Sequence, residues 1–585
     1  MKSAIPSHRT ASGVSRESQD APMRPPARLP TASSLLALLI LAVAAVPLIS
    51  AEPAAAKPRP TATASSFQGG NEPGFALDGN GTSLWHSRWG EPRATLPQWI
   101  MLDQGEVGMV ACLLYQPRPD GGNGTVTKYN VAVSSDGQAF TTVVTGGQWA
   151  ASAKRKVATF APVPARYIRL EVLDGVGGFA SAAELTVAAT PIDPSVERNV
   201  VAVSAPAYGG DIEGDTPIRI AAPGLVTATV SCWKQGAGSG GAGAEATVGT
   251  ITLDGAGKGS LVFPANDFPH GPLCLRIAAS NGNIHDTCWL QLFNRGGVPW
   301  NEGMPKEAPA AAAGMGLIFA DDFATLPTIS DSDPTATYYS HKPPDGGQDF
   351  SSLRFTDLHQ PANPFTQTGT WLRIRADETK HSAGLISSLK KDGSGVVASL
   401  PCYFECRFLG ANATGAWPAF WLLSKSAKYP DQHVPCDELD IIEAYGGEGP
   451  GRPNAGDKYC ITPHAWNQGA AGKKLEDDVV KQMGGIVASM KQAGIPSTWF
   501  QAPHTYGCKI TESDTIYYCD DIEVRRHKTM PVSKQEPFYF LINLATGGGW
   551  PVDLARYGGI ADMYIDYVRV YSANAGDLER VKQGK

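Results

Sequence analysis

Three carboxylates lie in an otherwise apolar, β-branched run at positions 438–443. The run holds Glu438, Asp440 and Glu443 among leucine and isoleucine residues. Acidic residues are rare in strands, and a buried charge is costly unless it is paired or used. On a strand, Glu438 and Asp440 share a face, and a β-bulge would turn Glu443 onto the same face. Carboxyl groups gathered in this way have separated pKa values, which suits a nucleophile and a general acid acting on a glycosidic bond.

The acidic motif alone is weak. The chain has 56 acidic residues among 585, so chance supplies roughly half a match to this spacing in such a chain. A solvated acidic strand is therefore the alternative interpretation. The neighbouring sequence favours a catalytic site over a solvated strand, because Trp417 and Trp421 lie just upstream. Aromatic faces stack on the apolar faces of sugar rings and supply much of the contact area of a saccharide site.

The region from Met315 to Ser572 resembles the family 16 glycoside hydrolases, in the bulged branch that includes laminarinases. Its motifs occur in the family's order: Phe319–Phe323, Tyr403–Arg407, the Trp-Pro-Ala-Phe-Trp segment at 417–421, the Glu-x-Asp-x-x-Glu motif at 438–443, Pro463–Trp466, His504–Gly507, Asn543–Gly548 and Met563–Tyr571. The resemblance implies a jelly-roll domain of the concanavalin type. It also implies endo-hydrolysis of a β-linked polysaccharide with net retention.

The same resemblance implies roles for individual residues. Glu438 would be the nucleophile and Glu443 the acid/base, while Asp440 would hold a proton or hydrogen bond that tunes Glu438. The implied substrate-binding residues are Trp417, His464 and Trp466. A structural histidine is the alternative for His464, and Trp421 fits the core as well as it fits a ligand. No cofactor is expected for catalysis.

The substrate expected from the resemblance is a β-1,3-glucan or a mixed β-glucan. A β-galactan of the agarose or carrageenan type is the runner-up, and a transglycosylase would use the same carboxylates. The alternative from another class is a non-catalytic glycan-binding protein, although such relatives typically lack the glutamates that this chain has. The segment Tyr338–Phe355 matches no laminarinase feature and is expected to shape the cleft.

Composition narrows the classes of partner. The net charge is −7, with no lysine or arginine cluster beyond isolated pairs such as Arg525-Arg526. Nothing in this balance attracts nucleic acid or an anionic membrane, and a neutral polysaccharide is compatible with it. We expect a monomer.

Short alternating runs broken by Gly, Asn and Asp fill residues 64–189, which is typical of a β-sandwich. This segment resembles discoidin-like modules (coagulation factor 5/8 C-type), the group that includes the family 32 carbohydrate-binding modules. The matching residues are Ala76–Asn80, Thr82, Trp85–Ser87, Tyr129–Gly137 and Ala182–Leu185. By resemblance, His86, Arg118 and Phe179 form a small sugar pocket. A packed core residue is the alternative for His86.

Structural calcium is implied by the same resemblance. Its ligands in the discoidin-like module would be Asp78, Thr82 and Glu184, and the alternative is a simple Asp-Gly turn without metal. Hard cations such as calcium take six to eight oxygen ligands, so backbone carbonyls must complete the shell. A second calcium position is implied at Asp566 on the last strand of the hydrolase-like region, with an ordinary exposed aspartate as the alternative.

The predicted architecture is all-β and multidomain. A signal peptide and N-terminal extension (1–56) precede a discoidin-like β-sandwich (58–191), an immunoglobulin-like β-sandwich read as a spacer (195–304), the jelly-roll domain (315–573) and a disordered tail (574–585). The ten cysteines fit structural disulfides together with a few buried thiols in an exported protein. Their pairing stays open.

The apolar run Leu35–Ile49 follows Arg24 and Arg28, and small residues come after it. It is short for a bilayer span, so it indicates a cleaved secretory signal and a secreted or periplasmic protein without stable membrane insertion. An uncleaved anchor is the alternative.

We therefore expect the exported protein to begin between about Ala51 and Lys57, because Ile49-Ser50-Ala51 and Ala54-Ala55-Ala56 both resemble small-residue cleavage sites. N-terminal sequencing of the secreted protein checks this. Recovery of secreted chains that still contain Leu35–Ile49 would contradict cleavage.

Overall fold

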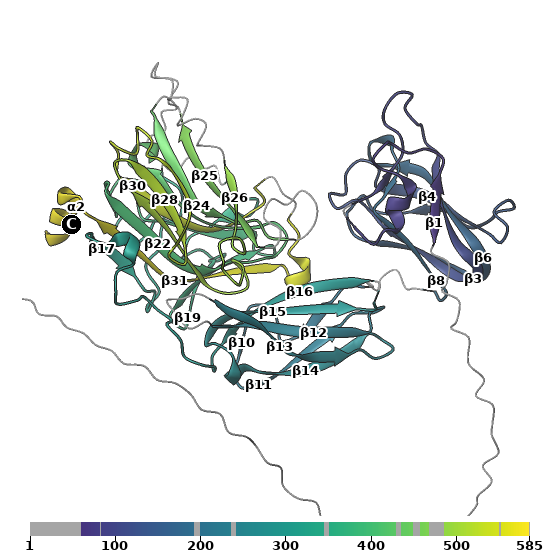
Figure 1. Cartoon of the computed structure of the whole chain (residues 1–585), viewed down its shortest axis with the longest axis horizontal. Coiled ribbons are helices and arrows are strands. Elements are labelled where there is room, and N and C mark those ends of the chain that lie inside the picture. Colours follow the sequence, from purple (N-terminus) through teal and green to yellow (C-terminus); the bar gives the residue numbers. More distant parts are fainter. Residues whose placement is uncertain are drawn as a thin grey trace, which may run out of the picture. The chain divides into compact units, whose positions relative to one another are not determined.

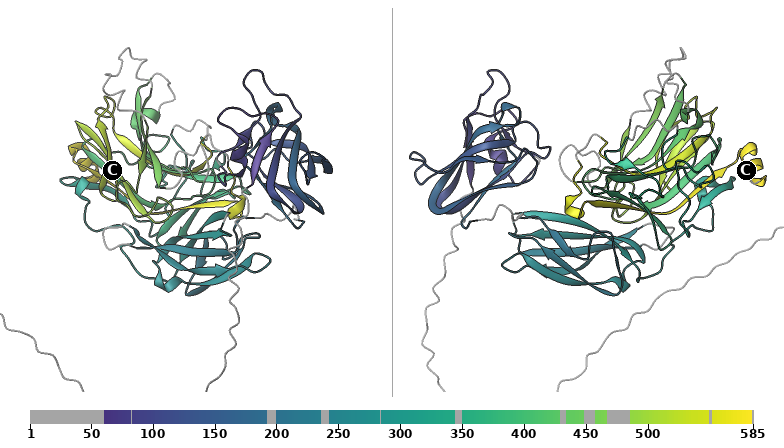
Figure 2. Two further views of the ribbon diagram at one scale, coloured as in Figure 1. Left: turned by 45° about the vertical axis from the view of Figure 1, so that its right-hand side comes forward. Right: turned by 180° about the vertical axis from the view of Figure 1, so that it is seen from behind.

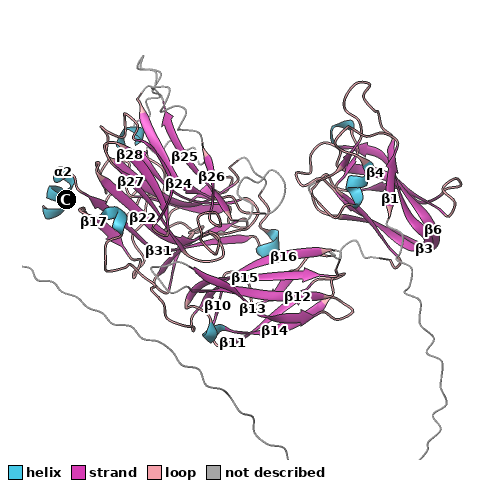
Figure 3. Cartoon of the chain, in the orientation of Figure 1, coloured by secondary structure: helices cyan, strands magenta, loops and turns pink. Residues whose placement is uncertain are grey.

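The computed structural model describes residues 60–81, 83–191, 199–235, 242–282, 284–343, 350–428, 434–447, 457–466, 485–548 and 552–583. The predicted signal segment lies outside them. Strands dominate (Figure 3), and the described residues contain one α-helix together with short 3-10 turns. The predicted all-β, multidomain fold class is confirmed. Among the same residues, no helix combines the length and apolar character needed to cross a bilayer.

The first group of strands, purple and blue in Figure 1, forms a six-stranded sheet in the order β1-β3-β6-β4-β5, with β8 beside β3 and a separate β2–β7 pair. Its strands are β1 (Thr61–Ala64), β2 (Trp85–His86), β3 (Gln98–Gln116), β4 (Val126–Ser134), β5 (Thr141–Gln148), β6 (Lys156–Gly175), β7 (Ser181–Ala182) and β8 (Glu184–Ala188). Alternating apolar residues of β3, β4 and β6 fill a core of its own, which includes Trp85, Ile168 and Leu185.

The second group, teal in Figure 1, is a sandwich of a five-stranded sheet (β10-β16-β15-β12-β13) and a three-stranded sheet (β14-β11-β9). Its strands are β9 (Ala202–Ala205), β10 (Gly210–Ile212), β11 (Asp215–Ala221), β12 (Thr227–Gln235), β13 (Ala242–Thr252), β14 (Lys258–Pro264), β15 (Gly271–Ser280) and β16 (His285–Asn294).

The third group pairs fifteen strands in one curled sheet whose main order is β26-β25-β24-β23-β30-β21-β20-β31-β22-β27-β28-β29. Its elements are β17 (Gly316–Asp321), β18 (Arg354–Phe355), β19 (Phe365–Thr368), β20 (Trp371–Asp377), β21 (Ser382–Ser387), β22 (Cys402–Leu409), β23 (Ala416–Ser424), β24 (Cys436–Glu443), β25 (Lys458–Trp466), β26 (Ile486–Ser489), β27 (His504–Ile510), β28 (Asp514–Cys519), β29 (Ile522–Lys528), β30 (Phe538–Thr546), β31 (Ile560–Ser572) and α2 (Ala575–Lys582).

The two halves of this large sheet lie face to face as layers, as the green and yellow strands of Figure 2 show. A contact across the layers is made by Phe319 of β17 and Phe540 of β30, whose ring centroids are 5.9 Å apart. Buried apolar side chains from both halves share one core, as a jelly roll requires.

The predicted disordered tail is wrong for residues 574–583. The Asn574 side chain caps α2 by accepting hydrogen bonds from the backbone of Gly576 and Asp577. The buried Asp577 carboxylate in turn accepts from the Ser399 backbone at 2.7 Å and from the Ser572 hydroxyl at 2.7 Å. These bonds fix the helix to the strands beside it.

The cysteines also differ from expectation. Cys232, Cys274, Cys402, Cys406, Cys436, Cys508 and Cys519 are buried free thiols. Burial raises the thiol pKa at Cys402 and Cys406 well above its ordinary value, so these groups are unreactive. Among the described residues, these seven cysteines therefore contribute to the core as apolar side chains.

The second sandwich does more than space its neighbours apart, because its side chains contact the third group. The Gln291 amide donates to the Gly410 carbonyl at 2.5 Å. The rings of Trp289 and Phe500 meet edge to face at 4.9 Å, and Arg556 forms an ion pair with Asp286.

The segment that leaves the second sandwich is fixed just as firmly. Arg407, fully buried on β22, pairs with Asp566 of β31 and donates to the carbonyls of Asn301 at 2.7 Å and Gly303 at 2.6 Å. Arg569 donates to the carbonyls of Pro305 and Glu307, at 3.0 Å each. Buried guanidinium groups are costly without such partners.

We expect a variant that begins at residue 199 to melt close to the full chain's hydrolase transition. One that begins at residue 311 should melt several degrees lower or be insoluble, because it loses the carbonyl partners of Arg407 and the cover of Phe500. Each lost hydrogen bond to a buried charge costs about 1.5–3 kcal/mol. Calorimetry of the two variants checks this, and equal melting temperatures would show that the contacts contribute little.

Candidate active site

Strand β24 carries the three carboxylates, and it is bulged as predicted. Against β23, Trp421 pairs with Asp440 and Phe420 with Ile442, which leaves Ile441 as the extra residue. Against β25, Asp440 and Glu443 pair with Thr462 and Cys460, so three residues of β24 match two of β25. The bulge changes the phase of the strand, and Glu443 turns to the face of Glu438 and Asp440.

Strand β25 supplies the partners of Glu438. His464 lies opposite Glu438 in the register. Its Nε2 is 3.8 Å from the Glu438 Oε1 and 3.3 Å from the Asp440 Oδ2. The Trp466 indole N–H donates to the Glu438 Oε2 at 3.2 Å. One carboxylate thus receives two contacts from the neighbouring strand.

Glu443 has partners from its own strand and from the residues that directly follow it. The Tyr445 hydroxyl donates to the Glu443 Oε1 at 3.1 Å. The side chains of Asp440 and Glu443 also share a hydrogen bond, which raises the pKa of Asp440 and lowers that of Glu443. Those directions mean that Asp440 carries the proton and donates it. Asp440 was expected to tune Glu438, but the hydrogen bond of this structure runs to Glu443.

Burial is the largest influence on all three carboxyl groups, and it raises the pKa of each. For Asp440 the charges of Glu438 and Glu443 add to burial and hold the pKa well above the ordinary value. For Glu438 burial raises the pKa, and the charge of His464 and the Trp466 N–H offset part of that rise. The strand therefore combines a carboxyl group kept neutral with one helped to ionise.

Aromatic rings border the carboxylates. Trp466 is 46% exposed and stacks on His464 with 4.9 Å between centroids. Trp417 stacks on Tyr445 at 5.3 Å, and the edge of Phe350 meets it at 5.4 Å. The structure thus brings all the predicted catalytic and substrate-binding residues of the hydrolase-like region together.

Trp421, for which core and ligand contact were both open, is buried and its indole donates to the Asn543 amide oxygen at 2.8 Å. It supports the neighbouring Trp417, whose carbonyl accepts from the other end of the same amide at 3.2 Å. Sequence reasoning missed Tyr445, although its place two residues after Glu443 puts it on the same face of an extended chain. It also missed Phe350, which belongs to the unmatched segment Tyr338–Phe355.

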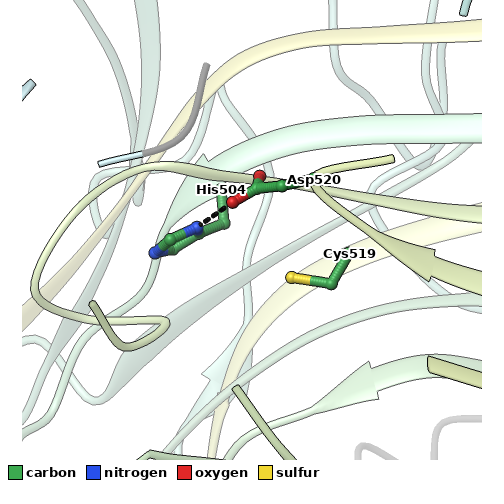
Figure 4. A group of neighbouring side chains, drawn as sticks. All are labelled: His504, Cys519 and Asp520. Carbon is green, nitrogen blue, oxygen red and sulfur yellow. Dashed lines mark hydrogen bonds and ion pairs between the residues drawn. The ribbon is translucent and has the colours of Figure 1, made fainter. Parts of the chain in front are cut away.

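His504, Cys519 and Asp520 form a second cluster of side chains of the kind that can hold a metal (Figure 4). Both histidine nitrogens are engaged: Nδ1 bonds the Asp520 carboxylate at 2.6 Å, and Nε2 bonds the Ser497 hydroxyl at 3.0 Å. Asp520 has a positive φ of 48° in the turn between β28 and β29. Its other oxygen accepts from the Thr505 backbone at 2.9 Å, so the cluster fixes this turn.

In the first group of strands, His86 lies 4% exposed among aromatic rings. Its ring centroid is 4.7 Å from that of Trp89 and 5.4 Å from that of Phe179. Arg118 is one of the charges that lower the pKa of His86, after burial, and its guanidinium donates to the Asn123 carbonyl at 2.8 Å. The three predicted sugar contacts are therefore neighbours. Trp89, 46% exposed, adds a ring that sequence reasoning missed.

The predicted metal ligands divide into two cases. Asp78 and Glu184 are neighbours: burial, then the charge and hydrogen bond of Asp78, raise the pKa of Glu184 to about 7. Thr82 lies outside the described residues. Asp566 is fully buried and faces the Arg407 guanidinium, which takes the place a cation would need. The structure thus gives Asp566 an ion pair in place of the predicted calcium.

Comparison with known proteins confirms the predicted resemblance. Residues 61–185 match the family model described as F5/8 type C domain. The chain is 30% identical over 276 residues to the endo-1,3-1,4-beta-glycanase EglC of Rhizobium meliloti, covering 44% of this chain and 52% of that protein. It is 27% identical over 299 residues to the glucan endo-1,3-beta-glucosidase A1 of Niallia circulans, covering 45% of this chain and 38% of that protein.

A third relative is the A type blood N-acetyl-alpha-D-galactosamine deacetylase of Flavonifractor plautii. The chain is 41% identical to it over 140 residues, which is 23% of this chain and 18% of the relative. The chain thus spans about half the length of the first glycanase relative and less than a fifth of the deacetylase.

Proposed function

We propose that this protein is a secreted endo-glycoside hydrolase that cleaves a β-linked polysaccharide with retention, and that its substrate is a β-1,3-glucan or a mixed β-glucan. The observation that carries the proposal is the bulge at Ile441, which turns the side chains of Glu438, Asp440 and Glu443 to one face of β24. The glucan preference rests on the glycanase relatives, whose names specify 1,3- and 1,4-β linkages.

The roles follow from the partners of each carboxyl group. Glu438, which His464 and Trp466 help to ionise, attacks the anomeric carbon and forms the glycosyl-enzyme. Glu443, whose pKa burial raises, gives its proton to the departing glycosidic oxygen and then takes a proton from the attacking water. Asp440 keeps its own proton and orients Glu443. Trp417 and Trp466 offer ring faces to the sugars on either side.

Glu438→Ala and Glu443→Ala should fail in different ways. The first cannot form the glycosyl-enzyme from any substrate. The second should still be glycosylated by an activated aryl β-glycoside, because a good leaving group needs little acid assistance. Added azide should then speed turnover of Glu443→Ala and give a β-glycosyl azide, and each variant should lose several orders of magnitude in rate on the glycan.

Product analysis by NMR decides the assignment. A β-azide from Glu438→Ala would reverse the two roles. Near-normal activity of both variants would show that the motif is not catalytic. Glu512→Ala, a substitution at an exposed glutamate between β27 and β28, serves as the control and should keep full activity.

We also propose that the first group of strands is a carbohydrate-binding module with a structural calcium ion. The residues present fit such an ion: one buried oxygen of Glu184 has no hydrogen-bond partner, and Asp78 brings a second carboxylate beside it. Asp78, Glu184 and, as a proposal, Thr82 would hold the ion together with backbone carbonyls. It would neutralise two adjacent carboxylates and fix the loop between them.

Chelation should therefore lower the melting temperature of the module in the full chain. Asp78→Ala should lower it too, and should abolish the effect of the chelator. Asp267→Ala, at an exposed residue of the second sandwich, should leave the effect intact. Calorimetry with and without EDTA checks this, and identical curves for the unmodified protein would contradict the metal.

A further inference from the structure

Tyr445 is a residue of the candidate active site that neither the motif nor the relatives' names assign. It follows β24 by two residues, in a stretch that keeps pairing with β23: the backbone of Ala444 donates to the Pro418 carbonyl at 3.0 Å, and that of Gly446 to the Ala416 carbonyl at 2.8 Å. Because the chain stays extended, Tyr445 shares the face of Glu443. Its hydroxyl then reaches the Glu443 Oε1 at 3.1 Å.

The ring of Tyr445 is held from two sides. It stacks on Trp417 with 5.3 Å between centroids and 25° between planes. Gly548, at a φ of +60°, closes against both rings: a Cβ there would lie 2.8 Å from the Trp417 ring and 2.9 Å from the Tyr445 ring. Only glycine allows this approach. The hydroxyl is therefore presented to Glu443 from a fixed ring.

Other groups also face Glu443. Asp440 and Glu438 lie on its own strand, His464 and Cys460 come from β25, and Trp417 comes from β23. Among the groups that lower the pKa of Glu443 against burial, the Tyr445 hydroxyl has the largest effect. The phenol itself stays protonated, since burial and the charge of Glu443 hold its pKa far above the ordinary value.

We propose that Tyr445 is a positioning residue for Glu443, whose carboxylate its fixed phenol holds in place for proton exchange with the glycan. The proposal rests on the proposed function, because it gives Glu443 the acid/base role. The phenol donates to Oε1 of the Glu443 carboxylate, and Glu443 itself gives the proton to the glycosidic oxygen. Glu443 recovers a proton from water in the second step, and Tyr445 gains and loses none.

The test is Tyr445→Phe in the full chain, which keeps the ring stack on Trp417 and removes only the hydroxyl. Loss of a donor to the carboxylate raises the pKa of Glu443, and the acid form of Glu443 starts the reaction. In the pH profile of kcat/KM, the basic limb should therefore move to higher pH by ~0.5–1 unit. The value of kcat/KM at the pH optimum should fall about tenfold. Tyr518→Phe, at a half-buried tyrosine of β28, is the matched control and should change neither.

Three results separate the possibilities. If Glu443→Gln is inactive on glycan but Tyr445→Phe keeps the original basic limb, this proposal fails and the proposed function stands. If Glu443→Gln is fully active, the proposed function itself fails. Should Tyr445→Phe not fold, 3-fluorotyrosine at position 445 keeps the shape and makes a stronger donor. The basic limb should then move to lower pH, and an unmoved limb would overturn the proposal.

Discussion

One extra residue in one strand determines where the three carboxylates of the candidate active site lie. On a regular strand, Glu443 would face away from Glu438 and Asp440, since the side-chain period is two and the spacing from Asp440 is three. It would then enter the apolar core beneath β24, where an unpaired carboxylate is costly. Ile441 absorbs the difference, and its own side chain goes into the core. The carboxylates and the core are satisfied by the same irregularity.

Three buried carboxyl groups on one face repel one another and lose hydration. Contacts from the neighbouring strand offset part of this unfavourable free energy. The contacts from β25 go to Glu438 and Asp440, and Asp440 shares a hydrogen bond with Glu443. With Asp440 neutral, fewer negative charges share the face. The three carboxyl groups thus have different surroundings: contacts oppose the effect of burial on the pKa at Glu438 and Glu443, while burial and both neighbouring charges act together at Asp440.

Much of this site could be predicted from local spacing, and the remainder depends on partners far along the chain. The positions of Glu438, Asp440 and Glu443 require a bulge if all three are to share a face, so sequence alone implied it. The N-cap Asn574 was also a local signal, and it was overlooked. By contrast, the ion pair between Arg407 and Asp566 joins residues 159 apart, and no hydrophobic periodicity of the sequence predicts it. For Trp421 the sequence leaves both a ligand contact and a core position open. The hydrogen bond to Asn543, 122 residues further along the chain, is what places it in the core.

The same kind of long-range pairing joins the segment that leaves the second sandwich to the strands of the hydrolase-like region. Arg407 and Asp566 are both fully buried, and a single carboxylate cannot satisfy all the N–H groups of a guanidinium. The carbonyls of Asn301 and Gly303 take up part of the remainder, and the Gly303 backbone N–H donates to Asp566 at 3.0 Å. Strands β22 and β31 therefore depend on a segment that lies outside the hydrolase-like region in sequence. A boundary drawn where the family resemblance begins divides a hydrogen-bonded unit, and the physical domain starts earlier than the recognisable one.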